Sequence, residues 1–433
     1  MSARLDRSAA WFAASRSALL TLWALYLIPR ALLILLDVQP WSDAAYFYAR
    51  AGELAAGQGY LNHLGQPSAF WPPGWPLALS GVFTLFGKSV AAVGLFNLAC
   101  AAVSAALVLA LGRRIGGSEL AQPELCGRLA LLCLALYPNN AAYVSLALTE
   151  VFYTMLLLAI CWLLVVRHGW LALVGAGLLL GVATLVKPQT LVVVPLVLGI
   201  AVLRAPQIWP AVRAAVRKGV ILAALAALVV APWSLRNQRE LGHIVAVSTN
   251  GGVTLLTGNN NHADGGYVDH DPVYQALFAR KFGMDEIAYD AEATRLAKRW
   301  ITQHSWRFAG LMPKKFVKLW GPDGEALWNY EKGAASSAAY TPLFRVAFWI
   351  NLVWYWLLLL GFGAAFVIQV RRRWRAGRLF DWWLLPYGIA AYPTAIALVF
   401  SGQSRFHYPA MPLIALSVGW LLADWITRRR APG

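Results

Sequence analysis

The sequence predicts an all-α polytopic membrane protein. Hydrophobic residues make up 59% of its 433 residues, charged residues make up 13%, and the mean hydropathy is +0.55. Charged residues make up about 25% of an ordinary soluble domain, whereas several apolar runs here reach the ~20 residues that a helix needs to cross a bilayer. The net charge of +17 is typical of Lys and Arg in cytoplasmic loops, so no nucleic-acid partner is expected.

The candidate spans follow from the apolar runs in chain order, with boundaries that can shift by several residues. The first run is long for a signal-peptide core and has no clear cleavage site, so we expect it to remain as a span. About ten spans are predicted, and ten to thirteen if some runs divide differently. The runs are residues 16–36, 89–112, 128–148, 150–166, 170–186, 189–203, 219–235, 341–370, 382–400 and 408–427.

A shorter apolar run, from Gly74 to Phe86, is not expected to cross the membrane. It is too short to span comfortably, and three prolines interrupt its start. The stretch after Asp43 has small and aromatic residues at helical spacing, which is typical of a helix lying at a membrane surface. The sequence therefore predicts juxtamembrane helices in the first outer loop.

The distribution of basic residues sets the orientation. With the N-terminus in the cytoplasm, the dense Lys/Arg clusters all fall on the cytoplasmic side, as the positive-inside rule requires. These clusters lie at residues 113–114, 204–218, 371–378 and 428–430. If residues 74–87 crossed the membrane, the clusters would move to the outer side.

Three regions are expected from this layout. The segment between the two groups of spans is the only sizeable soluble part, and its tryptophans at positions 306, 320 and 328 suggest that it lies on the membrane interface. The predicted regions are an N-terminal transmembrane catalytic module at 1–235 with the first outer loop at 37–88, a periplasmic segment at 236–340, and C-terminal transmembrane helices at 341–433.

The four cysteines give no sign of crosslinks. All of them lie in or beside apolar runs: Cys100, Cys126, Cys133 and Cys161. No CxxC pair and no Cys/His ligand spacing occurs, so neither disulfides nor a structural zinc ion is expected.

Two acids stand out on the outer face. Asp43 precedes the surface helix, and Glu150 begins an apolar span. Each has a simpler explanation, because Asp43 is suited to N-capping and Glu150 is stabilised by the helix dipole. Ionisable residues at a membrane are nevertheless candidates for function.

Isolated cations gather on the same face. Lys187 ends an apolar run before a proline, Arg236 follows Pro-Trp-Ser-Leu, and Arg405 and His407 lie in the last outer loop. The alternative is that Lys187 snorkels to the interface and that the others are interfacial anchors. Because the acids and cations share one membrane face, they suggest a polar reaction chamber there.

The order of several motifs resembles a known family. The motifs are Ser-Asp-Ala-Ala-Tyr-Phe-Tyr-Ala at 42–49, Phe-Trp-Pro-Pro-Gly-Trp-Pro at 70–76, Leu-Thr-Glu at 148–150, Leu-Val-Lys-Pro at 185–188, Pro-Trp-Ser-Leu-Arg-Asn at 232–237, Ser-Thr-Asn-Gly-Gly at 248–252, Gly-Asn-Asn at 258–260 and Arg-Phe-His-Tyr-Pro at 405–409. Together they resemble the bacterial GT-C glycosyltransferases, the relatives of protein O-mannosyltransferase and of the aminoarabinose transferase that acts on lipid A. The resemblance covers most of the chain and implies a GT-C-like fold.

The sequence also departs from that family. Ala44 stands where an acid often follows the first-loop Asp, and Phe70 and Trp71 replace an acid and a lysine of the aminoarabinose transferases. These departures therefore argue against a metal site in the first loop, and a divalent cation as a cofactor is left as an alternative. The departures also argue against an aminoarabinose donor, and the absence of a large C-terminal soluble domain argues against an oligosaccharyltransferase.

The resemblance implies a membrane glycosyltransferase that takes a sugar from a polyprenyl-phosphate donor. Because a lipid phosphate is a good leaving group, one general base and cations that hold the phosphate are enough. Asp43 is expected to be the base, and Glu150 to orient a basic residue or the acceptor, or to share a cation. The expected phosphate ligands are Lys187, Arg405, Arg236 and His407. The expected substrate contacts are Trp41, Tyr46, Trp71, Trp75, Asn259 and Tyr408. The four aromatic residues of the first loop among them, Trp41, Tyr46, Trp71 and Trp75, are equally explained as an interfacial aromatic belt.

The partners implied are a polyprenyl-phosphate-linked sugar, a lipid, glycan or protein acceptor, and membrane lipids. The expected location is a bacterial inner membrane, with the active site facing the periplasm or cell exterior. A flippase for lipid-linked sugars or a small-solute transporter is the main alternative. It predicts acids and helix breaks at mid-membrane and two matching halves, which the sequence does not show. A structural scaffold would leave the outer polar residues unexplained.

Overall fold

The computed structural model describes residues 11–117, 120, 122–333 and 341–428. Within them the secondary structure is helical, with a single isolated β-bridge between Leu61 and Pro67. The predicted all-α class is confirmed.

Six helical segments in the described part of the chain are long and apolar enough to cross a membrane. They are Arg16–Ile34 (α2), Val90–Gly116 (α5), Ile208–Leu241 (α11), Thr341–Arg375 (α17), Trp382–Val399 (η5 and α18) and Ser404–Arg428 (η6 and α19). A seventh results if Pro138–Ser145 and Glu150–Val165 (α8), which are bent by 111°, form one broken span. The chain is therefore a multi-pass membrane protein.

The count by length and composition is lower than the predicted ten because other apolar runs form short helices. Of the ten predicted runs, Trp170–Val186 (α9) and Pro188–Leu203 (η2 and α10) have 10–17 residues each. Gly74–Phe86 (α4), which is not among the ten, is in the same length class. The predicted span 128–148 is divided into Pro123–Ala135 (α6), Pro138–Ala142 (α7) and the 3-10 turn Tyr143–Ser145 (η1). Proline has no N–H to donate within a helix and begins helices readily, and prolines stand at the start of α7 and of η2.

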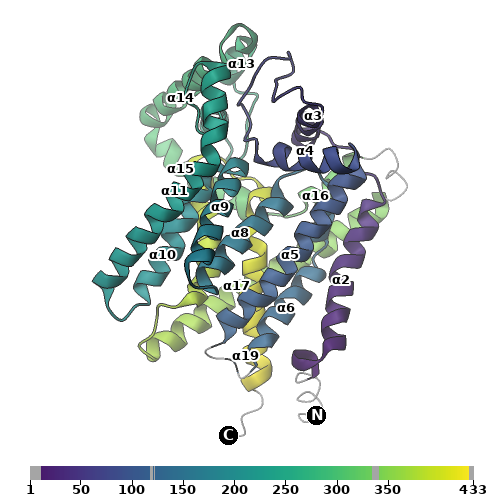
Figure 1. The fold of residues 1–433 in the computed structure, drawn as a ribbon, viewed down its shortest axis with the longest axis vertical. Coiled ribbons are helices and arrows are strands. Elements are labelled where there is room, and N and C mark those ends of the chain that lie inside the picture. Colours follow the sequence, from purple (N-terminus) through teal and green to yellow (C-terminus); the bar gives the residue numbers. More distant parts are fainter. Residues whose placement is uncertain (1–10, 118–119, 121, 334–340, 429–433) are drawn as a thin grey trace.

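The long helices form one bundle with a smaller helical layer at one end (Figure 1). The start of α2 and the end of α19 lie at the lower end of the bundle, whereas α3 (Asp43–Ala55), α4, α13 (Pro272–Ala279) and α14 (Glu286–Gln303) lie at the opposite end. The loops that the charge pattern assigns to the two sides of the membrane are thus at opposite ends of the molecule.

Small residues allow close helix packing in the bundle. A side chain at Gly112 of α5 would collide with the backbone of Gly127 in α6. In turn α6 packs along α19, and α9 packs along α11. Such contacts are typical of membrane helices, where small residues let two backbones approach.

The smaller layer at the upper end of the bundle, which is the outer layer in the predicted orientation, also contains α12 (Gly251–Gly258), α15 (Ser305–Trp320) and α16 (Glu325–Gly333). A small core of Val253, Leu256, Tyr274, Leu277 and Tyr289 joins α12, α13 and α14. Helices α13 and α14 are N-capped by the carboxylates of Asp271 and Asp285, as expected for these residues at helix starts.

The first outer loop contains the two predicted helices. In Figure 1, α4 lies across the upper end of the bundle next to α3, as expected for a helix that does not span. The two helices pack on each other, and α4 also packs on α5 and α9.

Candidate active site

A cavity of about 950 Å³ lies where the first outer loop, the outer layer and the ends of several membrane helices meet. Its polar wall includes four carboxylates and two cations: Asp43, Glu150, Asp269, Glu325, Lys187 and Arg405. Four of the sequence-predicted charged residues therefore line the same space, although they come from distant parts of the chain.

Asp43 begins α3 and points to Arg405. One guanidinium nitrogen of Arg405 lies 2.6 Å from Asp43 Oδ2, and both side chains are about one-quarter exposed or less. The N-cap position belongs to Ser42, whose side chain makes no capping hydrogen bond. The alternative that Asp43 is only an N-cap is therefore wrong, because its carboxylate is directed at a cation.

Arg405 also contacts a carboxylate that the motifs did not indicate. Its Nε lies 3.8 Å from Glu325 Oε1, and Ser404 Oγ donates to Glu325 Oε2 at 3.3 Å. Glu325 begins α16, and burial raises its pKa, an effect that the nearby Arg405 opposes. Nothing local in the sequence distinguishes it from other acids in the outer segment, so its position depends on the docking of α16.

Glu150 and Lys187 form the second ion pair. Lys187 Nζ lies 3.2 Å from Glu150 Oε1. Glu150 stands in the first turn of α8 and is 2% exposed, and Lys187 caps the C-terminus of α9 immediately before Pro188. Glu150 Oε2 is buried and has no hydrogen-bond partner among the described residues, which is costly unless a ligand meets it.

The remaining wall has an aromatic side and an apolar side. The rings of Trp41 and Trp328 lie 4.9 Å apart, and Trp71 packs on Phe47 of α3 at 5.8 Å. The apolar residues come from α8, the end of α9 and α18: Leu157, Val186, Ile389, Pro393, Ile396 and Ala397. Part of the cavity therefore suits a hydrocarbon chain.

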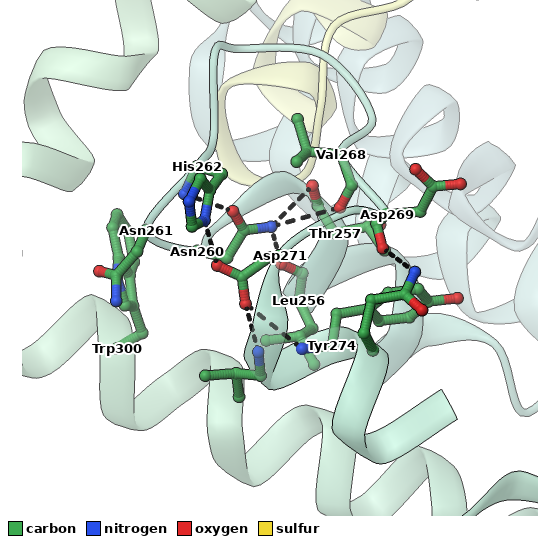
Figure 2. A network of polar contacts seen from close by, with 12 residues as sticks. Leu256, Thr257, Asn260, Asn261, His262, Val268, Asp269, Asp271, Tyr274 and Trp300 are labelled. Atoms are coloured by element: carbon green, nitrogen blue, oxygen red, sulfur yellow. Dashed lines mark hydrogen bonds and ion pairs between the residues drawn. The ribbon is translucent and has the colours of Figure 1, made fainter. Parts of the chain in front are cut away.

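The segment between α12 and α13 brings Tyr267 and Asp269 to the cavity. A network of hydrogen bonds fixes the shape of this segment (Figure 2). Asn260 donates to the carbonyls of Leu256, Thr257 and Val268, and Asp271 bonds His262 Nδ1 at 2.9 Å. The Asp269 carboxylate points away from this network.

Two predicted phosphate ligands lie outside the cavity lining. Arg236 donates to the carbonyls of Ser68 at 2.7 Å and Tyr60 at 2.8 Å, so it holds the first outer loop. His407 is 1% exposed, stacks between the rings of Trp320 and Tyr355, and contacts the Leu319 carbonyl through Nδ1. Neither imidazole nor guanidinium is available to a ligand in the cavity.

Four predicted substrate contacts are also absent from the lining. Tyr46 packs behind Trp71, with ring centroids 6.1 Å apart. Trp75 is fully buried and donates to the Ala147 carbonyl. Asn259 bonds Lys315 and the Val399 carbonyl, and Tyr408 packs on Tyr143. Of the predicted aromatic contacts, Trp41 and Trp71 do line the cavity.

The residues present do not fit a divalent cation held by the site carboxylates. Within the described residues, no three His, Cys, Asp or Glu side chains are grouped to hold a metal ion. The guanidinium of Arg405 contacts both Asp43 and Glu325, so these two carboxylates are already paired with a cation.

The comparisons with known proteins come from the sequence and from the fold. Residues 71–235 match the family model described as dolichyl-phosphate-mannose-protein mannosyltransferase. A search of curated proteins finds no match.

Several solved structures have a similar fold. The Archaeoglobus fulgidus oligosaccharyltransferase tethered with an acceptor peptide superposes with a TM-score of 0.53 at 13% identity, covering 97% of this chain and 50% of that one. The same organism's oligosaccharyltransferase AglB, in complex with an inhibitory peptide and a dolichol-phosphate, gives 0.50 at 12% identity, with 96% and 51% coverage. ArnT from Cupriavidus metallidurans bound to undecaprenyl phosphate gives 0.44 at 14% identity, with 96% and 79% coverage. The chain spans about half the length of the oligosaccharyltransferases that it matches.

Proposed function

The chain has the fold of the GT-C membrane glycosyltransferases, and we propose that it transfers a sugar from a polyprenyl-phosphate donor to an acceptor at the outer face of the membrane. The single observation that carries this proposal is the convergence of the Asp43–Arg405 and Glu150–Lys187 pairs in one cavity. The family match across residues 71–235 supports the same class of reaction.

The donor is matched by two parts of the cavity. Lys187 and Arg405 lie 13% and 18% exposed, so a phosphate between them interacts with partly desolvated cations. The apolar side contributed by α8 and α18 is suited to the first isoprene units. A soluble nucleotide-sugar donor would not need this hydrocarbon surface.

The chemistry then assigns a role to each charged residue. The acceptor hydroxyl attacks the anomeric carbon, its proton passes to the Asp43 carboxylate, and the bond between the anomeric carbon and the phosphate oxygen breaks with its electrons leaving on the phosphate. Lys187 and Arg405 stabilise that charge as it develops. Because the phosphate competes for Arg405, its binding weakens the ion pair between the guanidinium and Asp43 and leaves the carboxylate free to accept the acceptor's proton.

Glu150 and Glu325 act through the cations. Glu150 fixes the Lys187 ammonium through one oxygen, and its second oxygen is left for a substrate hydroxyl. Glu325 lies near the Nε of Arg405, whereas Asp43 contacts its Nη2, so the two carboxylates hold the guanidinium through different nitrogens. Trp41, Trp71 and Trp328 provide aromatic faces against which a sugar ring can stack.

The proposed setting is the plasma membrane of a bacterium, with the cavity towards the periplasm. The positive-inside pattern supports this orientation, since the basic clusters at residues 113–114, 204–218 and 371–378 lie towards the bundle end opposite to α3 and α14. We keep the division into a catalytic module at 1–235, a periplasmic segment at 236–340 and C-terminal helices at 341–433 as part of the proposal.

Comparing lipids and glycans from cells with and without the gene tests this function. Mass spectrometry of envelope extracts should show one glycan, glycolipid or glycoprotein that lacks a hexose or pentose, together with accumulation of the polyprenyl-phosphate sugar. Complementation by the wild-type gene should restore the product, whereas an Asp43→Asn gene should not. Unchanged envelope sugars in the deletion strain would contradict the proposal.

A further inference from the structure

Two charged side chains outside the cavity hold the part of the first outer loop that leads into it. Arg236 belongs to the end of α11, and Glu286 is the first residue of α14. Both contact the short segment Ser68–Ala69. Neither residue lines the cavity, and neither takes part in the chemistry described above.

The Glu286 carboxylate accepts three hydrogen bonds. Ser68 Oγ donates to Oε2 at 2.6 Å, and the Ala69 amide and Thr249 Oγ1 donate to Oε1 at 2.9 Å and 2.6 Å. Bonds to an ionised acceptor are about twice as strong as neutral ones. The carboxylate therefore ties the first outer loop to the segment that precedes α12.

Arg236 secures the opposite side of the same segment. It donates to the Ser68 carbonyl at 2.7 Å and to the Tyr60 carbonyl at 2.8 Å, and the Thr249 amide donates to the Ala69 carbonyl at 2.9 Å. The carbonyl and the amide of the Ser68–Ala69 peptide are thus hydrogen-bonded to residues more than 160 positions later in the chain.

The clamped segment leads directly to the catalytic wall. Trp71 and Pro72 follow Ala69 and line the cavity. Trp71 packs on Phe47 and Tyr46 of α3, with ring centroids 5.8 Å and 6.1 Å apart. Since α3 begins at Asp43, the position of the predicted base depends on a wall that is fixed at Ser68–Ala69.

We propose that Glu286, together with Arg236, is a positioning residue that sets Trp71 and α3, and through them Asp43, against the bound donor. The inference rests on the proposed function for its kinetic consequence, but the clamp itself is a property of the fold. Misplacing a reacting group by about 1 Å can cost 10²-fold in rate, so loss of the clamp should lower turnover more than donor binding.

The first test measures the clamp without any activity. Hydrogen exchange at pH 7 compares the amides of residues 60–72 and of α3 in the wild type, Glu286→Ala and Glu286→Gln. Glu286→Ala should speed exchange about tenfold or more, because three donors lose an ionised acceptor. Glu286→Gln should recover most of the protection, since one oxygen remains and the Ser68 hydroxyl can rotate. Glu292→Ala is the matched control, because Glu292 lies on the same helix and its carboxylate bonds the exposed Arg295 rather than the first outer loop.

The second test separates positioning from stability. Glu286→Ala should lower single-turnover transfer about tenfold or more, while the Kd for undecaprenyl phosphate stays within twofold, because Lys187 and Arg405 are not on the clamped loop. Ser68→Ala is a milder variant of the same contact, and the double variant should lower the transfer rate by less than the product of the two single losses.

If exchange in residues 60–72 is unchanged in Glu286→Ala and Ser68→Ala, the proposed clamp does not exist. If exchange rises but turnover does not fall, the positioning role is wrong. An inactive wild type with the expected exchange pattern would refute the transferase and leave the clamp standing.

Discussion

At the scale of single residues, the site depends on contacts that no local pattern specifies. Asp43 and Arg405 are 362 positions apart, yet their side chains meet at 2.6 Å. Their motifs predicted two polar residues on one membrane face, and the fold turns them into an ion pair. Arg236 was also a candidate by its motif, but its guanidinium donates to backbone carbonyls of the first outer loop.

The first prediction concerns the two cations that line the cavity. Lys187→Ala and Arg405→Ala should each lower single-turnover transfer by about 10²–10³-fold, because each removes charge that stabilises the departing phosphate. The double variant should lose less than the product of the two, since both cations act on one group.

Arg204→Ala is the control for the loss of a cation elsewhere, because Arg204 pairs with Asp381 away from the cavity. Normal transfer by both single variants would show that Lys187 and Arg405 are interfacial anchors.

A buried lysine makes the second prediction. Lys315 is fully buried, donates to Asn259 Oδ1 at 2.7 Å and to the Leu398 and Val399 carbonyls, and burial lowers its pKa to about 8. The unfolded chain, with a lysine pKa of about 10.4, binds more protons between these values. Wild-type thermal stability should therefore rise with pH from about 8 to about 10, and stay level below 8.

The measurement is the apparent Tm at pH 7 and pH 9.5 for wild type and Lys315→Met. The Met variant should lack the rise, because it cannot titrate. Lys318→Met, which removes a half-exposed lysine paired with Asp264, should keep it. Parallel profiles for wild type and Lys315→Met would contradict the lowered pKa.

At the scale of elements, hydropathy located the apolar runs but not their breaks. The run at 128–148 is one continuous signal by composition, whereas the chain breaks at Pro138 and turns by 111° before α8. That turn places Glu150 at the head of α8 inside the cavity. The proline was visible in the sequence, but whether it kinks or ends a helix depends on which neighbours satisfy the freed backbone groups.

The docking of α4 on α9 makes an element-scale prediction. A Cβ at Gly74 would lie 2.7 Å from backbone atoms of Leu185 and Val186, next to Lys187. Gly74→Ala should destabilise the protein by about 1–3 kcal/mol, because backbone cannot move aside as a side chain can. Gly81→Ala, on the same helix with nothing within 4 Å, should be neutral or stabilise by up to about 1 kcal/mol. Thermal unfolding of both variants checks this, and equal effects at the two positions would refute the close packing.

At the scale of the whole molecule, the sequence predicted the helical class and the GT-C fold but not which helices touch. The order of the motifs along the chain indicated the fold, because each motif alone is weak evidence for the family. It did not reveal Glu325, because the position of α16 at the cavity depends on its packing on α7 and α17. Nor did it show that Asn259 serves the packing of Lys315 rather than a substrate.

The orientation of the bundle makes a prediction at this scale. A single cysteine at Asn62 should be accessible from outside, and cysteines at Arg114 and Arg372 only from the cytoplasm. Asn259 and Ser401 are on the same predicted side as Asn62 but are buried, so they are not used as labelling sites. Cells treated with an impermeant thiol reagent, with and without permeabilisation, provide the measurement, in a background where the four native cysteines are replaced. Labelling of position 114 from outside would show that α4 crosses the membrane.

The most direct test of the account is cleavage of a polyprenyl-phosphate sugar by the purified protein. The assay follows release of free polyprenyl phosphate in a single turnover, with an envelope extract as the source of acceptor. Wild type should release it, and Asp43→Asn should release it about 10²–10⁴-fold more slowly while binding undecaprenyl phosphate as tightly. Near-normal release by Asp43→Asn would contradict its assignment as the base, and a wild type that moves the intact lipid-linked sugar across a bilayer without cleaving it would be a transporter.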